Sequence, residues 1–229
     1  MIAITFALPT ESSGLRRQLR NARRFGDMVS GKIGEHAVTV LHTGVGAKNC
    51  NERVEALLHK VRPRLVISSG FAGAIVEDLN VGDLLLAENF SDRQLLSAAE
   101  QILRDRSPRV AKLFTSTSIV DSVAERNEIA RSSGAAAVDM ETGAIVGICN
   151  AHGVPLLSLR ALSDTPKEPL PAPPNVLFDI ERQRTDPRKL FGHIIAGPTA
   201  IIRLLQFSRQ IREARAVLTD ALVELIRAM

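Results

Sequence analysis

The chain has 229 residues, 45% of them apolar, and its 29 Lys and Arg against 25 Asp and Glu give a formal net charge of +4. This composition is typical of one globular domain and excludes a disordered, collagen-like or coiled-coil chain. No stretch of about 18 apolar residues is free of charge, which argues against a transmembrane helix. The first residues lack the basic and apolar regions of a secretion signal, so we expect a cytoplasmic protein.

The cysteines, histidines and aromatic residues exclude several binding functions. Cys50 and Cys149 are too few for a disulfide framework or a four-cysteine zinc site, and we expect both to be small buried residues. The absence of Trp and Tyr and the modest charge disfavour nucleic-acid binding. The five histidines are not spaced as metal ligands, so we predict no metal site, and His42 is expected to be structural. The histidines are His36, His42, His59, His152 and His193.

Strand-like and helix-like segments alternate along the first two thirds of the chain. Short apolar, β-branched runs predict strands at Ile2–Leu8, Ala37–His42, Arg64–Ser69, Asp83–Ala87, Lys112–Ser116, Ala135–Met140 and Val154–Leu162. Helical spacing of apolar residues predicts helices at Glu11–Arg23, Ala47–Lys60, Leu95–Arg104, Val123–Arg131 and Glu141–His152. This alternation favours a three-layer α/β/α fold with a central mixed, largely parallel sheet.

The composition changes after Asp164, where five prolines fall within nine positions. They predict a non-helical loop. We expect a catalytic domain over 1–168, a proline-rich loop over 169–185 and C-terminal helices over 186–229 that pack on the same domain. Pro187 and Pro198 suit the first turns of such helices. The prolines of the loop are Pro166, Pro169, Pro171, Pro173 and Pro174.

The last predicted helix is amphipathic. Apolar residues recur at three- and four-residue intervals, and most arginines lie off this stripe. We expect the apolar face to pack on the domain; the alternative is a lid, or a surface that meets a lipid-like substrate or a membrane. The stripe consists of Ile211, Ala214, Leu218, Leu222 and Leu225.

Two glycine-containing segments follow predicted strands. His42-Thr43-Gly44-Val45-Gly46 lets backbone amides approach a ligand, but Asn49 stands where a dinucleotide fingerprint needs glycine. Alone, this segment favours a plain tight turn. Ser68–Ala74 suits either a ligand crevice at the carboxyl end of a strand or close loop packing.

Carboxylates stand at the ends of three predicted strands. Glu11 is a candidate acid or a helix-start residue. Glu141, which follows Asp139 and Met140, suits binding of two sugar hydroxyls or stabilises a helix N-terminus. Asp164 suits a general acid if burial raises its pKa, or caps a turn.

Taken together, these segments resemble the nucleoside phosphorylase and nucleosidase family, in particular its methylthioadenosine/adenosylhomocysteine nucleosidases. The resemblance runs from Ile2 to about Asp164, and its last two motifs are the most specific. The motifs are Ala7-Leu8-Pro9-Thr10-Glu11, Thr43-Gly44-Val45-Gly46, Gly70-Phe71-Ala72-Gly73, Val81-Gly82-Asp83, Val138-Asp139-Met140-Glu141 and Arg160-Ala161-Leu162-Ser163-Asp164.

The resemblance implies a role for each candidate residue and requires no cofactor. Asp164 matches the acid that protonates, or hydrogen-bonds to, N7 of the leaving purine, and Glu11 matches the residue that positions or deprotonates the attacking water. Glu141 matches the carboxylate that holds the ribose hydroxyls. Seven further positions match supporting parts: Met140 against the sugar, Arg160 and Ser163 orienting the acid, and Val45, Phe71, Ala72 and Gly73 lining the pocket.

Departures from the family pattern bear on the choice between hydrolysis and phosphorolysis. The phosphate-binding arginines of the phosphorylases are missing near Pro9 and at Ser68, and the bulky Phe71 replaces a common serine. Both changes favour hydrolysis, because a buried phosphate next to an apolar ring is costly. If Arg16 or Arg17 reaches the site, phosphorolysis remains an alternative.

Two regions depart further from the nucleosidases. The stretch from Asp83 to Val138 is shorter than in the usual nucleosidases, with Ile119 or Val120 where a Phe is common, so we expect the 5′ group of the substrate to be unusual or large. The segment from Phe178 to Asp186 and the basic helices resemble the tails of bacterial hopanoid-associated members, which act on an adenosylated lipid.

We therefore expect a nucleosidase that cleaves a purine nucleoside, specifically a 5′-modified adenine nucleoside, and that forms a homodimer. The alternatives are a phosphate-dependent phosphorylase, including one acting on an adenosylated lipid, and a non-catalytic nucleoside-binding protein. Membrane or lipid contact through the C-terminal helices is a further alternative.

Overall fold

The computed structural model describes residues 1–177 and 199–229. Its strands form one ten-stranded sheet. They are β1 (Ile2–Phe6), β2 (Arg20–Phe25), β3 (Met28–Ile33), β4 (His36–His42), β5 (Leu65–Ala74), β6 (Leu84–Ala87), β7 (Arg109–Ala111), β8 (Leu113–Thr115), β9 (Ala137–Asp139) and β10 (Leu156–Asp164).

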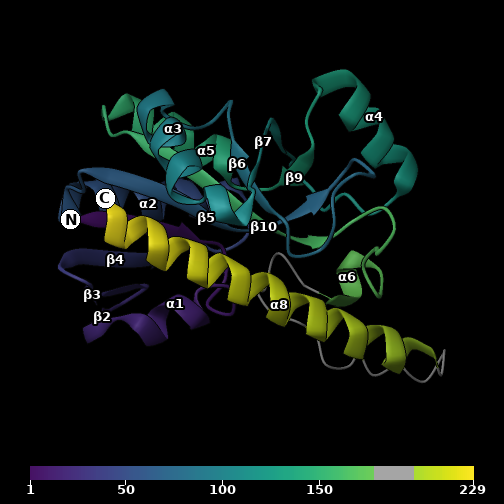
Figure 1. Ribbon diagram of the computed structural model, residues 1–229, viewed down its shortest axis with the longest axis horizontal. Helices are drawn as coiled ribbons and strands as arrows, with labels where there is room; N and C mark the ends of the chain where they lie inside the picture. Colours follow the sequence, from purple (N-terminus) through teal and green to yellow (C-terminus); the bar gives the residue numbers. More distant parts are fainter. Residues whose placement is uncertain (178–198) are drawn as a thin grey trace.

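Helices cover both faces of this sheet (Figure 1). They are α1 (Ser13–Gln18), α2 (Ala47–Val61), α3 (Arg93–Ile102), the 3₁₀ turn η1 (Arg104–Arg106), α4 (Val123–Ser133), α5 (Thr142–Ala151), α6 (Pro174–Leu177) and α8 (Thr199–Ala228).

The main path of the sheet has the order β2-β3-β4-β1-β5-β10-β6-β7, and β9 joins β5 to β8. The central strands β4, β1, β5 and β10 are parallel to their neighbours in that group. β2, β3 and β6 join the sheet antiparallel, as does β9 to β5. The prediction of a mixed, largely parallel sheet between helical layers is confirmed.

The alternation of side chains along β1 divides the core into two parts. Ile2, Ile4 and Phe6 point to the face covered by α1, α3 and α8, whereas Ala3 points to the face covered by α2 and α5. Because successive strand residues face opposite sides, a strand buried on both faces reads as continuously apolar. This explains why the central strands were predictable from sequence.

The helix predicted over Glu11–Arg23 is wrong in its second half. The helix ends at Gln18, and Arg20–Phe25 forms the edge strand β2, which pairs with the unpredicted strand β3. Every residue of β2 is exposed, so its sequence carries no apolar alternation that marks a strand. The short strand β7 was missed as well.

The tail departs from the predicted loop at one place. Pro174–Leu177 forms a short helix, α6, which begins with a proline, as a first helical turn tolerates. Pro187, Pro198 and the segment 178–186 lie outside the described residues, and the domain boundaries at 168 and 185 stay predictions.

Helix α8 carries the predicted apolar stripe. Ala214, Leu218, Leu222 and Leu225 are buried in the same cluster as the strands, and Figure 1 shows this half of α8 lying across the sheet. The other half extends past the sheet toward α6. In the described part of the chain, no helix has the length and apolar character needed to cross a membrane.

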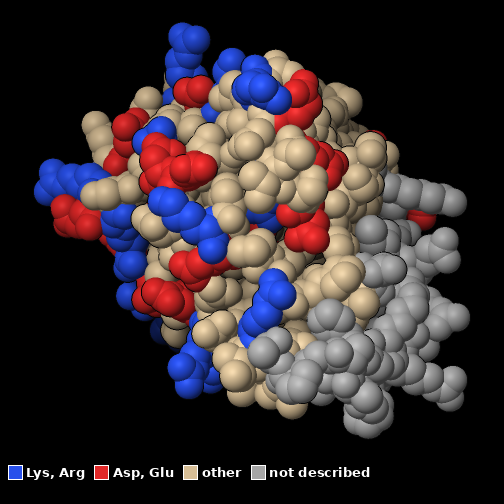
Figure 2. Space-filling model, turned by 90° about the vertical axis from the view of Figure 1, so that its right-hand side faces the viewer, with Lys and Arg blue, Asp and Glu red and all other residues tan. Residues whose placement is uncertain are grey.

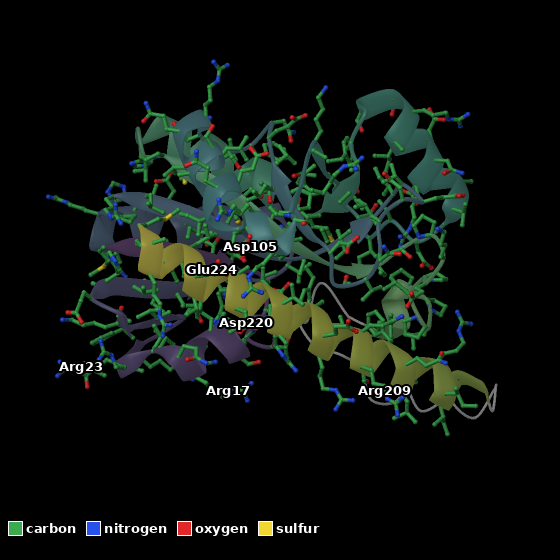
Figure 3. The ribbon with its side chains drawn as sticks, viewed as in Figure 1. Arg17, Arg23, Asp105, Arg209, Asp220 and Glu224 are labelled. Carbon is green, nitrogen blue, oxygen red and sulfur yellow. The ribbon has the colours of Figure 1, made fainter. Side chains whose placement is uncertain are left out.

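Charged side chains are distributed over the outside of the molecule. Arg17 on α1, Arg23 on β2 and Arg209 on α8 point away from the body in Figure 3, while Asp220 and Glu224 lie along the same helix as Arg209. Acidic and basic groups are interspersed on the face shown in Figure 2. This distribution gives no support for a nucleic-acid surface on that face.

Candidate active site

A cavity of about 370 Å³ lies at the edge of the sheet where the central parallel strands end. This is the edge where open α/β sheets bind ligands. Nine of the ten predicted site residues line the cavity, and only Arg160 does not. The nine are Glu11, Val45, Phe71, Ala72, Gly73, Met140, Glu141, Ser163 and Asp164.

Glu11 reaches the cavity from the turn after β1 and is held by the backbone. Its Oε2 accepts a hydrogen bond from Leu8 N at 2.7 Å, and its Oε1 accepts one from Phe71 N at 3.0 Å. Burial nevertheless raises the pKa of Glu11. Gly70 permits this approach, because its φ is +146° and a Cβ there would stand 2.9 Å from Glu11 Oε1. The side chain is therefore a buried carboxyl group that the backbone holds in one position.

Asp164, at the end of β10, is held by two donors. Its Oδ1 accepts from Ser163 Oγ at 2.7 Å, and its Oδ2 accepts from the guanidinium of Arg126. Gly73 lies against it, since a Cβ at that position would stand 2.9 Å from Oδ2. Ser163 Oγ also lies 3.4 Å from Ala72 O, so its one proton can turn to either acceptor.

Arg126 is a residue that the sequence analysis missed. It lies on α4, is 1% exposed, and donates a second hydrogen bond to Ala74 O at 2.7 Å. An arginine in a surface-like helix sequence gives no signal of burial.

Glu141 does not cap its helix, although it precedes α5. Its Oε1 accepts a hydrogen bond from Gly46 N at 3.0 Å, in the glycine segment after β4. Burial and, next, the nearby Asp139 raise the pKa of Glu141 to about 8. The two segments suggested by sequence, around Gly46 and around Glu141, are thus parts of one site.

The expected contact of Arg160 with the acid is wrong. Its guanidinium donates to Asp139 Oδ2 at 2.9 Å and to Ser68 Oγ at 2.8 Å, and it also donates to Thr142. Asp139 in turn accepts from the backbone N of Thr142 and so caps α5. Arg160 is therefore a buried cation near Glu11 and Glu141. Arg126, not Arg160, forms the ion pair with Asp164.

A second, much smaller cavity lies beside Glu11. It measures about 10 Å³ and is bounded by Glu11, Glu141 and Arg160. The hydroxyls of Thr5 and Ser69 also border it, and neither has a hydrogen-bond partner within the described part of the chain. A polar cavity of about this volume holds one water molecule.

Part of the lining of the large cavity is apolar. This part includes Ile119, Val120, Leu170 and, from α8, Phe207. A separate hollow of about 500 Å³ lies on the other side of Phe207, but none of the predicted site residues lines it. The chemical groups therefore converge on the 370 Å³ cavity.

His42 has the structural role that the sequence predicts. Its Nε2 lies 2.7 Å from Ser12 Oγ, and burial lowers its pKa to about 4. Both cysteines are buried free thiols. Burial raises the pKa of Cys50 and of Cys149 to about 12.

Comparison with known proteins gives a consistent family. The model of the phosphorylase superfamily matches residues 1–93 and 88–196. The 5′-methylthioadenosine/S-adenosylhomocysteine nucleosidase of Staphylococcus haemolyticus is 26% identical over an alignment of 196 residues, which spans 72% of this chain and 86% of that protein.

Solved structures share the fold at lower identity. The nucleosidase of the same name from Streptococcus pneumoniae, bound to a transition-state inhibitor, superposes with a TM-score of 0.75 and 22% identity over 99% of this chain and 98% of that one. A futalosine hydrolase mutant of Helicobacter pylori gives a TM-score of 0.63 and 19% identity over 71% and 87% of the two chains.

Proposed function

The chain belongs to the phosphorylase superfamily, and we propose that it is a nucleosidase that hydrolyses the N-glycosidic bond of a purine nucleoside. The substrate is a 5′-modified adenine nucleoside of the methylthioadenosine or adenosylhomocysteine type. The curated relative carries the name of such a nucleosidase and spans most of this chain. The convergence of Glu11, Glu141 and Asp164 on one cavity supports the same reaction.

The substrate is held with its ribose against Glu141 and Met140. Once ionised, the Glu141 carboxylate accepts hydrogen bonds from two sugar hydroxyls. Its negative charge also offsets the positive charge that develops on the sugar as the bond to the base breaks. The 5′ substituent lies toward the apolar wall of Ile119, Val120 and Phe207.

The small cavity is the observation that carries hydrolysis. It has room for one water molecule between Glu11, Glu141 and Arg160, and it is far too small for a phosphate ion. Water attacks the anomeric carbon, the bond from that carbon to the purine nitrogen breaks, and its electron pair leaves with the purine. Glu11, whose pKa burial raises, takes the proton of the water.

Asp164 acts on the leaving base. Arg126 holds Oδ2, while Ser163 can release Oδ1 by turning its hydroxyl to Ala72 O. Oδ1 is therefore the oxygen that contacts N7 of the purine, and it passes to N7 a proton that it takes from solvent, because the ion pair with Arg126 holds Asp164 as a carboxylate. The purine then leaves as a neutral base, which lowers the barrier to bond cleavage.

The phosphorylase alternative gains no support from the cavity. Among the described residues that line it, none is Lys or Arg, and Phe71 occupies the wall next to Glu11. Arg16 and Arg17 do not border it either. A phosphate ion in such surroundings would lack charged partners.

The test is adenine release, followed by chromatography, from methylthioadenosine, adenosylhomocysteine, adenosine and deoxyadenosine. We expect release in phosphate-free buffer, fastest with a 5′-thio substituent. Nucleoside binding without any release would indicate the non-catalytic alternative. Release only from a substrate with a larger 5′ group, such as an adenosylated lipid, would keep the reaction and change the substrate.

The expected assembly and location are proposals of the same kind. We propose a homodimer, tested by light scattering of the purified protein, and a cytoplasmic location, tested by cell fractionation. Contact of α8 with lipid is supported by the exposure of Ile201, Ile202 and Leu205 near its start. Vesicle sedimentation of the full chain, compared with a variant that has Asp at these three positions, tests it.

A further inference from the structure

A cluster of metal-ligating side chains lies outside the nucleoside site. Glu55 and His59 are one turn apart on α2, and His152 directly follows α5. His152 Nε2 lies 2.7 Å from Glu55 Oε2, and His59 Nε2 lies 3.8 Å from the same oxygen. The three ligand atoms are all within 4.8 Å of one another.

The cluster is remote from the cavity. Glu141 precedes α5 and His152 follows it, and a helix of ten residues is about 15 Å long. The helices α2 and α5 pack together on one face of the sheet through Val54, Cys149 and their apolar neighbours. The cluster therefore sits where two packed helices meet, and the proposed reaction uses none of its residues.

The chemistry of the three donors selects the ion. Two imidazoles and one carboxylate suit zinc and similar transition metals, whereas magnesium and calcium prefer oxygen ligands alone. Zinc–ligand bonds of about 2.0–2.2 Å in a tetrahedral site separate the ligand atoms by about 3.3 Å. The distances of 2.7 and 3.8 Å to Glu55 Oε2 lie on either side of that value.

Small rotations can close the site, because the side chains of Glu55 and His59 are 44% and 73% exposed. A hydrogen bond between Glu55 and His152 explains one of the contacts without a metal. His59, one turn after Glu55 on α2, also directs its Nε2 toward the same oxygen, so that both imidazoles face one carboxylate. The edge-on arrangement of the two rings, with centroids 5.2 Å apart, likewise brings both imidazoles to one point.

We propose that Glu55, His59 and His152 bind one Zn²⁺ ion, which joins α2 to α5. Three protein ligands leave a fourth coordination position for water. The sequence spacing alone misses this site, because His152 is distant from α2 along the chain. The sequence therefore predicts no metal site, although Glu55 and His59 are four residues apart on one helix.

The test uses the untagged, chelator-treated full chain and zinc alone. We expect calorimetry to show one Zn²⁺ bound per chain and the melting temperature to rise with zinc, since the ion binds the folded state. His59→Ala and His152→Ala should each weaken zinc binding at least about tenfold and abolish the thermal shift. His36→Ala, at the start of β4, is the matched control and should bind zinc as the native protein does.

The zinc-free melting temperatures of the variants show whether they fold. If His152→Ala does not fold, His152→Gln, which keeps more of the side-chain volume, takes its place. Absence of zinc binding by the native chain at a hundredfold excess over protein would overturn the proposal. So would zinc binding that the double variant His59→Ala/His152→Ala leaves unchanged.

Discussion

Arg126 and Asp164 form an ion pair that is shielded from water, with side chains 1% and 9% exposed. They come from α4 and from the end of β10, which are 38 residues apart in the chain. Arg126 also binds Ala74 O, so it ties the acid to β5 as well. The pair fixes one oxygen of Asp164 and leaves the other for the purine.

Removing Arg126 should destabilise the protein through the charge left behind. Breaking a buried pair by deleting one partner costs about 3–5 kcal/mol, since the remaining charge has no partner. We expect Arg126→Met to lower the free energy of unfolding, measured in urea, by that amount. Arg126→Met combined with Asp164→Asn should recover part of the loss. Strictly additive losses in the double variant would show that the two side chains are not coupled.

Asp164→Asn should abolish most turnover and leave nucleoside binding intact. An amide keeps the shape of the side chain but cannot supply a proton, and positioned acids contribute about 10²–10⁴-fold to rate. Ser163→Ala, which removes only the donor to Oδ1, should have a smaller effect. The measurements are kcat for adenine release and calorimetric binding of methylthioadenosine. Turnover close to that of the native enzyme in Asp164→Asn would remove this residue from the mechanism.

The pH dependence should report Glu141. Burial raises its pKa to about 8, so below that pH the free enzyme carries a protonated Glu141 that cannot accept two hydroxyls. We expect kcat/KM to rise with pH up to about 8 and then to level off. Glu11, with its pKa also raised, contributes in the same direction.

Glu141→Gln distinguishes the contribution of Glu141 to the pH profile from that of Glu11. This substitution removes the group whose pKa is raised to about 8, partly by the charge of Glu11, so the rise of kcat/KM near that pH should disappear in the variant. The variant should also lose discrimination between ribose and 2′-deoxyribose substrates. An unchanged pH profile together with unchanged discrimination would contradict the assignment of Glu141 to the sugar.

Gly73→Ala should inactivate the enzyme by displacing the acid. A Cβ at Gly73 would stand 2.9 Å from Asp164 Oδ2, so the carboxylate and its pair with Arg126 must move. Gly147→Ala in α5 is the matched control, because no atom stands within 4 Å of the Cβ it would add. The control should keep full activity and gain helix stability. Equal activities of the two variants, compared as kcat/KM, would show that the position of Asp164 is not critical.

The sequence predicts the strands that are buried on both faces, because continuous apolar runs identify them. It fails at β2, where the exposed Arg20–Phe25 carries no apolar pattern and pairing with β3 alone makes the strand. The same division holds at the site. Glu11, Glu141 and Asp164 stand at strand ends and are recognisable there, whereas Arg126 reaches Asp164 from a helix whose sequence looks like a surface.

Tertiary packing likewise decides which side chains that are distant in sequence pair with one another. The resemblance places Arg160 near Asp164. In the structure, Arg160 instead donates a hydrogen bond to Asp139 and borders the small cavity beside Glu11. Sequence spacing puts Arg160 and Asp164, which are four residues apart, on one face of a regular strand, but the pairing of β10 with β5 shifts between Leu162 and Asp164. The choice depends on the register between β10 and β5.

The sugar product distinguishes hydrolysis by a water molecule next to Glu11 from phosphorolysis. Methylthioadenosine is incubated with the enzyme with and without phosphate, and the sugar product is identified by mass spectrometry. We expect free methylthioribose at a rate that phosphate does not change, and almost none of it from Glu11→Gln. Release of adenine only with phosphate, accompanied by a sugar 1-phosphate, would contradict it.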